Sequence, residues 1–181
     1  MDYTAKYRSP LGEITLACDG RALTGLWFAG QAHAGFSLDA MHMEAPHPIL
    51  AQTAVLLDRY FSGDIPRTRP PMHLRGTLFQ RAVWTLLQTI PVGETVTYGD
   101  LADCLAGAQP AARMSPQAVG NALARNPILI LIPCHRVIAA DGSMSGYAAG
   151  PERKRLLLMH ERGGDITPYT HIFSDSGQNA P

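Results

Sequence analysis

The fold and the chemistry of this chain depend on one stretch, Ile128-Leu129-Ile130-Leu131-Ile132-Pro133-Cys134-His135-Arg136-Val137. Its first part is an uninterrupted aliphatic run, which is typical of a buried strand, and the proline ends that run. A rigid strand end would hold the thiol of Cys134, the strong soft nucleophile of the stretch, in a fixed place. The imidazole of His135 and the guanidinium of Arg136 are expected to favour the thiolate form of Cys134.

Other interpretations of Cys134 can be tested on the sequence. Buried cysteines are common and mostly inert, so a structural role is the alternative for a cysteine considered alone. A phosphatase loop needs an arginine at the position where Ala140 stands, and a papain-like hydrolase has its histidine far from its cysteine in sequence. Adjacent residues of a strand point to opposite faces, so His135 reaches the thiol only through a turn at Cys134 or through a water.

The composition is that of an ordered globular protein. The 181 residues suffice for one large or two small domains, and 46% of them are hydrophobic. Fifteen basic and fifteen acidic residues give a net charge of zero, so any nucleic-acid contact must come from a local patch. Three scattered cysteines argue against a disulfide framework. Because no long apolar run or signal-like N-terminus is present, we expect a cytoplasmic protein without membrane contact.

The first half of the chain predicts a small sheet followed by a helix. Residues 1–29 contain two turn sequences between alternating or apolar segments, which is typical of strands. Residues 49–61 carry apolar side chains at helical spacing and stop at Ser62-Gly63. Residues 66–76 are rich in proline and arginine without periodicity, and we expect a linker there.

The second half predicts short helices. Residues 77–90 have helical periodicity, Thr97 and Asp100 form a capping-box pattern, and Ser115-Pro116 begins a further helix over residues 117–125. Two short helices followed by a strand and a glycine-rich loop are typical of a helix-turn-helix with a wing. A last helix follows Gly150-Pro151, and the segment 166–181 is expected to be a mobile tail.

Several motifs resemble those of the O6-alkylguanine-DNA alkyltransferases, which repair alkylated DNA by accepting the alkyl group themselves. These motifs are Pro133-Cys134-His135-Arg136-Val137, Arg125-Asn126-Pro127, Gly146-Tyr147, His160-Glu161, Tyr98 within residues 93–98, Ser9-Pro10-Leu11-Gly12 and Leu23-Thr24-Gly25-Leu26. The resemblance implies an α/β fold in two parts. A ribonuclease H-like sheet-plus-helix domain would occupy residues 1–75, and a winged helix-turn-helix-like domain would occupy residues 76–165.

The resemblance also implies a reaction centred on Cys134. Cys134 would accept the alkyl group, His135 would deprotonate it through a water, and Glu161 would orient the imidazole. Tyr98 would donate a proton or a hydrogen bond to a ring nitrogen of the departing guanine. Asn126 would fix the turn between the recognition helix and the segment that carries the cysteine. The nucleotide must be flipped out, and the inert thioether product means that each molecule reacts once.

Further residues would shape the pocket and contact DNA. The backbone carbonyls of Cys134 and Val137 would accept from the exocyclic amine of guanine. The predicted pocket walls are Leu123, Tyr147 and Ala148. The recognition helix, which enters the minor groove in this family, would contact DNA through Gln117, Ala118 and Arg125, and Arg136 is predicted as a further DNA contact. For Arg136 a structural ion pair is the alternative, which the resemblance favours.

The expected enzyme is a methylated-DNA–[protein]-cysteine S-methyltransferase that acts as a monomer on double-stranded DNA containing alkylated guanine, with O4-alkylthymine as a second candidate substrate. No cofactor or metal is expected, because the histidines and Cys18 lack paired ligand spacing. Two alternatives stay open. One is a lesion-binding protein without transfer activity, although such relatives carry tryptophan in place of the cysteine. The other is a winged-helix regulator that uses the thiol as a sensor.

We expect Gln117→Arg to tighten DNA binding. Many members of the family carry an arginine at this position, which fills the space left by the flipped base. Glutamine can fill the space and hydrogen-bond the orphaned cytosine, but it brings no charge, and Ser115-Pro116 separates the other nearby cation, Arg113, from the helix. An added cation at the phosphates should steepen the salt dependence of binding by about one counterion. Titration of a labelled duplex at several salt concentrations measures both quantities, and an unchanged affinity would count against an extruding role for Gln117.

Overall fold

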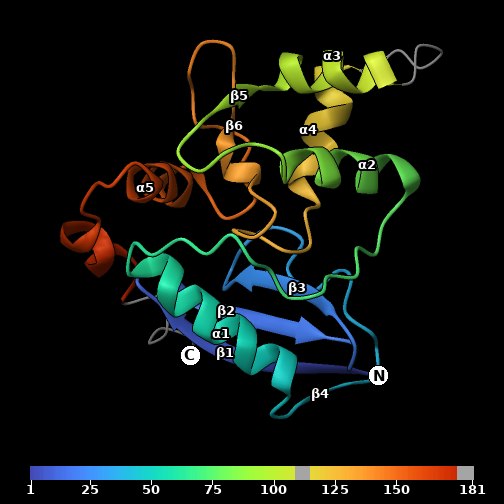
Figure 1. Cartoon of the computed structure of the whole chain (residues 1–181), viewed down its shortest axis with the longest axis vertical. Helices are drawn as coiled ribbons and strands as arrows, with labels where there is room; N and C mark the ends of the chain where they lie inside the picture. The colour runs from blue at the N-terminus through green and yellow to red at the C-terminus, as the bar shows by residue number, and fades with distance from the viewer. Residues whose placement is uncertain (109–114, 175–181) are drawn as a thin grey trace.

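The computed structural model describes residues 1–108 and 115–174, with the N-terminal sheet at one end of the molecule and the shorter helices at the other (Figure 1). The structure confirms a mixed α/β fold. The strands are β1 (Asp2–Ser9), β2 (Gly12–Cys18), β3 (Leu23–Phe28), β4 (His42–Glu44), β5 (Val96–Thr97) and β6 (Val137–Ile138). The α-helices are α1 (Pro48–Phe61), α2 (Leu78–Leu87), α3 (Tyr98–Ala108), α4 (Pro116–Ala124) and α5 (Pro151–Glu161), and the 3₁₀ helices are η1 (Cys134–Arg136) and η2 (Thr167–Phe173).

The predicted strands of residues 1–29 form the larger sheet, in the order β3-β2-β1-β4. β1 and β3 each pair with β2 in antiparallel fashion, while the short β4 pairs with β1 in parallel. The first hairpin closes where Ser9 Oγ accepts a hydrogen bond from the backbone of Leu11. α1 lies across one face of this sheet and packs on β1 and β2 (Figure 1). The sequence did not predict β4, because its three residues are all exposed and carry no apolar alternation.

Helix starts follow the predicted capping residues. Thr77 caps α2 in a capping box with Gln80. Thr97 and Asp100 form the reciprocal bonds predicted for α3, in which Thr97 Oγ1 accepts from the Asp100 backbone and an Asp100 carboxylate oxygen accepts from the Thr97 backbone. Ser115 Oγ accepts from the backbone amide of Ala118, the third residue of α4. These side chains satisfy amide groups that have no partner inside a helix, which is why the boundaries were readable from sequence.

The C-terminal part packs α2, α3 and α4 against one another, with β5 and β6 paired in parallel beside them. Trp84 of α2 is fully buried, and its indole nitrogen donates to the carbonyl of Ala122 in α4 at 2.9 Å. This bond ties two of the three helices together at their centre. None of the helices within the described ranges is long and apolar enough to cross a membrane.

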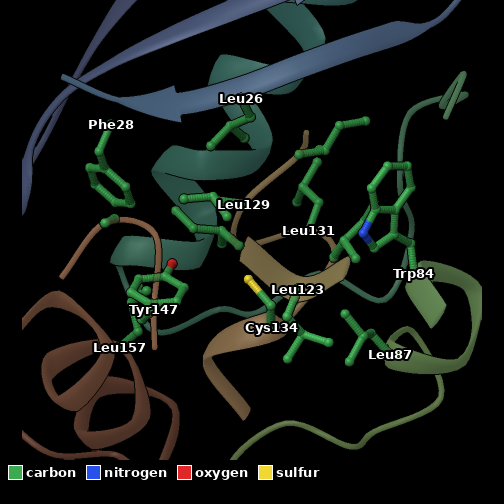
Figure 2. Packing of buried hydrophobic residues seen from close by; sticks show 14 of the residues in the cluster. Leu26, Phe28, Trp84, Leu87, Leu123, Leu129, Leu131, Cys134, Tyr147 and Leu157 are labelled. Carbon is green, nitrogen blue, oxygen red and sulfur yellow. The ribbon is translucent and has the colours of Figure 1, made fainter. Parts of the chain in front are cut away.

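One hydrophobic core joins the two parts of the chain (Figure 2). The backbone of Leu26 in β3 donates to the carbonyl of Pro127 at 2.9 Å and accepts from Leu129 at 3.0 Å. The sheet is therefore bonded directly to the segment that precedes Cys134. Cys134 itself is 3% exposed and lies within this shared core.

The predicted strand over residues 128–132 is wrong. Ile128 makes an isolated bridge to Leu26, and the chain then turns so that the Ile132 amide donates to the Ile128 carbonyl at 3.0 Å. Ile130 adopts a φ of 68°, which is unusual for a β-branched residue. The run is aliphatic because every residue of the turn is buried, and periodicity cannot separate a buried turn from a buried strand.

Two other expectations need correction. The linker over residues 66–76 has no helix, but it is attached to the sheet edge, since Leu23 donates to the carbonyl of Pro71 and accepts from His73. The segment predicted as a mobile tail packs on the protein over residues 166–174, where Ile166 is buried and η2 places the Phe173 ring against the guanidinium of Arg153. The rest of that tail, residues 175–181, and Arg113 lie outside the described residues.

Arg75→Met should lower the free energy of unfolding by about 3–5 kcal/mol, which is the cost of leaving a buried charge without its partner. Arg75 holds the fully buried carboxylate of Asp2 with two bonds, of 2.6 and 2.8 Å, and so fastens the end of the linker to β1. Chemical denaturation measures the change. The exposed pair of Arg59 and Asp64 provides the control, and Arg59→Met should cost less than about 1 kcal/mol. Equal, small losses in both variants would contradict a fastening role for Arg75.

Candidate active site

The side chain of Asn126 shapes the turn that presents Cys134. Its Oδ1 accepts from the Ile128 amide at 3.0 Å, and its Nδ2 donates to the Ile132 carbonyl at 2.7 Å. The same Nδ2 lies 3.1 Å from the sulfur of Cys134 and donates to it. Asn126 is 1% exposed, so these bonds compete with no solvent. The residue predicted to fix this turn therefore also contacts the candidate nucleophile.

The thiol of Cys134 is protonated in the resting protein. Burial raises its pKa to about 11, although the hydrogen bond from Asn126 and the positive charge of Lys154 both act to lower it. The expectation that neighbouring imidazole and guanidinium groups favour a thiolate is therefore wrong. In the structure the guanidinium of Arg136 is bonded to Glu161, and His135 is neutral, so neither group supplies a free positive charge to the sulfur.

The carboxylate of Glu161, the last residue of α5, accepts five hydrogen bonds. Its Oε1 accepts from Tyr60 at 2.9 Å, from His135 Nε2 at 2.7 Å and from Arg136 Nη2 at 2.8 Å. Its Oε2 accepts from Arg136 Nε at 2.8 Å and from the Gly93 amide at 3.1 Å. Burial would raise the pKa of Glu161, but the hydrogen bonds from His135 and Arg136 and the positive charge of Arg136 outweigh it and hold this pKa well below its usual range. The carboxylate is therefore ionised.

The tautomer of His135 follows from this contact. An ionised carboxylate can only accept, so Nε2 of His135 carries the proton and Nδ1 is the free base. His135 is fully buried, and burial lowers its pKa, while Glu161 opposes the shift and Arg136 and Lys154 add to it. Within the described part of the chain, no protein group hydrogen-bonds to Nδ1. His135 is thus a neutral, oriented base next in sequence to the thiol.

Arg136 is a structural residue, and its predicted DNA contact is wrong. It is 4% exposed, two of its nitrogens bond Glu161, and the third donates to the backbone carbonyl of Ile90. Because the guanidinium is buried against Glu161 and Ile90, it does not reach the surface where a phosphate could bind. The ion-pair alternative, which the family resemblance favours, is confirmed.

Tyr98 lies at a groove of about 650 Å³ that runs between the start of α3, the exposed face of α4 and the loop after β6. Its hydroxyl donates to the carbonyl of Ser145 at 3.3 Å. Burial, and then the nearby Cys134, raise the pKa of Tyr98, so the hydroxyl keeps its proton. A Cβ on Gly146 would come within 2.9 Å of this hydroxyl, and the φ of 80° there also requires glycine.

The other predicted site residues lie either in the buried core around the site or on α4. Tyr147 is buried, and its ring lies at 77° to that of His135 with 6.4 Å between the ring centres. Leu123 is buried in the same core as Tyr147 (Figure 2). Val137 is buried in β6 opposite Val96, and the half-buried Ala148 accepts a backbone bond from Ala32. On α4, Gln117 and Arg125 are exposed and Ala118 is half-buried.

The sequence missed two of the groups that hold Glu161. Tyr60 matched the apolar face of α1 and carried no sign of a polar partner, which lies 101 residues away. Gly93 appeared only as part of the motif over residues 93–98, yet with a φ of 78° its amide donates to the carboxylate. Lys154 was also missed, although a lysine among the leucines of a buried helix face was a visible anomaly. Among the described residues, no group of three or more His, Cys, Asp or Glu side chains could hold a metal ion.

The fold and the site together define a mixed α/β protein with one buried cysteine that Asn126 hydrogen-bonds. Two family models match: "6-O-methylguanine DNA methyltransferase, ribonuclease-like domain" over residues 3–68 and "6-O-methylguanine DNA methyltransferase, DNA binding domain" over residues 78–163. The chain belongs to the 6-O-methylguanine DNA methyltransferase family.

Individual relatives agree with this assignment. The methylated-DNA–protein-cysteine methyltransferase of Mycobacterium bovis is 44% identical over 155 residues, which cover 85% of this chain and 88% of that protein. The protein of the same name from Haemophilus influenzae is 35% identical over 161 residues, covering 88% and 86%. The crystal structure of Mycobacterium tuberculosis OGT in complex with DNA superposes with a TM-score of 0.78 at 37% identity, covering 94% of this chain and 98% of that one.

Glu161→Gln should lower the free energy of unfolding at pH 7 by about 3–5 kcal/mol, because it leaves Arg136 buried without a counter-charge. The folded-state pKa of Glu161 is depressed, so its contribution is complete above the ordinary glutamate pKa of about 4.3 and is lost as the pH falls below that value. The difference between wild type and variant should therefore shrink in acid.

Denaturation curves between pH 3 and pH 8, in steps of about one unit, measure this difference. The matched control is Glu152→Gln, on the same helix, whose partner Arg155 is 41% exposed, and it should cost less than about 1 kcal/mol. A Glu161→Gln loss that stays constant with pH would contradict the assignment of an ionised carboxylate.

Proposed function

We propose that this protein repairs DNA directly, by moving an alkyl group from the O6 position of guanine in a flipped-out nucleotide to the sulfur of Cys134. The observation that carries the proposal is the buried arrangement of a protonated thiol beside a neutral histidine that an ionised Glu161 orients. Family membership supports the same reaction, since the relatives are named for a cysteine methyltransferase activity on methylated DNA.

The proton of the thiol moves to Nδ1 of His135, directly or through a water, as the sulfur attacks the alkyl carbon. The S–C bond forms while the C–O bond breaks, and its electron pair passes to the guanine. His135 becomes an imidazolium that the Glu161 carboxylate stabilises at 2.7 Å. Because the thiol pKa is about 11, proton removal has to accompany the attack. The thioether has no route back, so the protein reacts once and is consumed.

The departing guanine needs a proton or a hydrogen bond, and Tyr98 is placed to give it. Its hydroxyl keeps its proton and stands at the groove beside Gly146 and Ser145. The carbonyls of Cys134 and Val137 are the proposed acceptors for the exocyclic amine. The Cys134 carbonyl already accepts from the Val137 amide, and its second lone pair can take a further donor. Tyr147, Leu123 and Ala148 form the proposed walls for the alkyl group.

DNA would lie along the exposed face of α4. Gln117 and Asn121 stand four residues apart on that face and line the groove that contains Tyr98. In this proposal α3 and α4 act as a helix-turn-helix in a winged arrangement, Ala118 and Arg125 lie at the DNA, and the N-terminal sheet with α1 is ribonuclease H-like. Flipping the nucleotide costs a few kcal/mol, least for a damaged base. We further propose that the protein acts as a monomer in the cytoplasm. Its substrate would be double-stranded DNA that contains alkylated guanine, and O4-alkylthymine would be a second substrate.

Intact-protein mass spectrometry tests the transfer. Wild type incubated with a duplex that contains one O6-methylguanine should gain the mass of one methyl group per molecule, which peptide mapping should place on Cys134. Cys134→Ala should gain nothing, and Cys104→Ala, which removes an exposed cysteine, should behave as wild type. Tight lesion binding without any mass gain would instead indicate a lesion-binding protein. Neither binding nor transfer, with a reversibly oxidised Cys134, would indicate a thiol sensor.

A further inference from the structure

Lys154 is a buried charge that the mechanism above does not use. It belongs to α5, seven residues before Glu161, so both side chains point from the same face of the helix into the site. Its exposed fraction is 0%, the same as that of the aliphatic residues around it. Lysine is almost never fully buried unless it is paired.

The ammonium of Lys154 has no acidic partner. Within the described ranges no carboxylate lies within 4.0 Å of it, and the only carboxylate of this site, Glu161, is occupied by Arg136 and His135. The contact that its Nζ makes is a hydrogen bond of 3.3 Å to the carbonyl of Ser145. A buried cation that lacks a counter-ion costs stability, so its position requires an explanation other than folding.

A contact and an electrostatic interaction connect Lys154 with the reacting groups. Its Nζ lies 5.8 Å from the centre of the Tyr98 ring, over the face of the ring, and shares the Ser145 carbonyl with the Tyr98 hydroxyl. Burial raises the pKa of the Cys134 thiol and lowers that of Lys154, and the charge of each group opposes the shift of the other. Lys154 therefore lies against the candidate proton donor, and its charge acts on the candidate nucleophile.

We propose that Lys154 is a positioning residue of the transfer reaction, whose buried ammonium acts as the counter-charge of the sulfur anion and holds the Ser145 carbonyl that fixes Tyr98. The inference rests on the proposed function for its role in transfer. The thiol proton still goes to His135, and the S–C bond still forms as the C–O bond breaks. Lys154 keeps its own proton throughout and favours the state in which the sulfur carries negative charge.

Few groups near Lys154 could produce the same shift in the pH dependence of the reaction rate. The titratable and charged groups that face the lysine and the thiol are Tyr98 from α3, His135 and Arg136 from η1, Tyr147 from the loop before α5, and Glu161 from α5. Burial raises the pKa of both tyrosines and lowers that of His135, and Glu161 is ionised. Burial raises the pKa of the thiol to about 11 and lowers that of Lys154, so these are the two groups whose ionisation the Lys154 variants alter.

The test compares Lys154→Met, which keeps the length of the side chain and removes the charge, with Lys154→Arg, which keeps the charge. Two rates are measured across pH for each protein: single-turnover methyl transfer from an O6-methylguanine duplex, and alkylation of Cys134 by iodoacetamide, followed by peptide mass. In Lys154→Met both profiles should move up by about one pH unit, which is about a tenfold slower reaction at fixed pH. Lys154→Arg should recover most of the rate.

Arg153→Met is the matched control, because Arg153 neighbours Lys154 but packs on Phe28 and Phe173 away from the thiol. It should leave both pH profiles in place even if stability falls. Rates of Lys154→Met that equal those of wild type, or slower rates that Lys154→Arg does not restore, would overturn the inference. Failure of the wild type to accept methyl from DNA would refute the proposed function, and the iodoacetamide profile would still decide whether Lys154 is the counter-charge of Cys134.

Discussion

The ionised carboxylate of Glu161 is the interaction on which the rest of this structure depends. It collects donors from α1, from the turn that contains Gly93 and from η1, all at the end of α5. A carboxylate at the C-terminal end of a helix is unfavourable with respect to the helix dipole, so these donors have to compensate for both the dipole and the burial. The same bonds that join four segments of the fold also fix the tautomer of His135. Structural and chemical roles are therefore inseparable at this residue.

Burial of the reactive thiol has a consequence for the chemistry. In water a cysteine is partly ionised near neutral pH, whereas burial keeps Cys134 protonated and shielded. The site compensates with groups that favour the charged sulfur only locally: the amide of Asn126 at 3.1 Å and the ammonium of Lys154. A thiol of this kind stays unreactive until a substrate is aligned with it, which suits a protein that can react only once.

Much of the local structure could be predicted from the sequence because its causes are local. Capping residues such as Thr77, Thr97 and Ser115 bond amides within the next few positions, so they mark helix starts wherever the helix lies. The aliphatic run before Cys134 indicated burial correctly but gave the wrong conformation. Its turn is made by Asn126 and by the bridge to Leu26, and the second of these lies about a hundred residues away in sequence.

The sequence by itself determined the identity of the chemistry. The type and order of Cys134, His135 and Glu161, the turn asparagine and the helix boundaries are all written in short motifs that keep their meaning without a fold. Only the tertiary structure decided the protonation states and the ion pairing of those groups. The pKa of the thiol, the tautomer of the imidazole and the structural role of Arg136 depend on burial and on hydrogen-bond partners that long-range packing brings within 3 Å. Burial and these partners cannot be inferred from the spacing of residues along the chain.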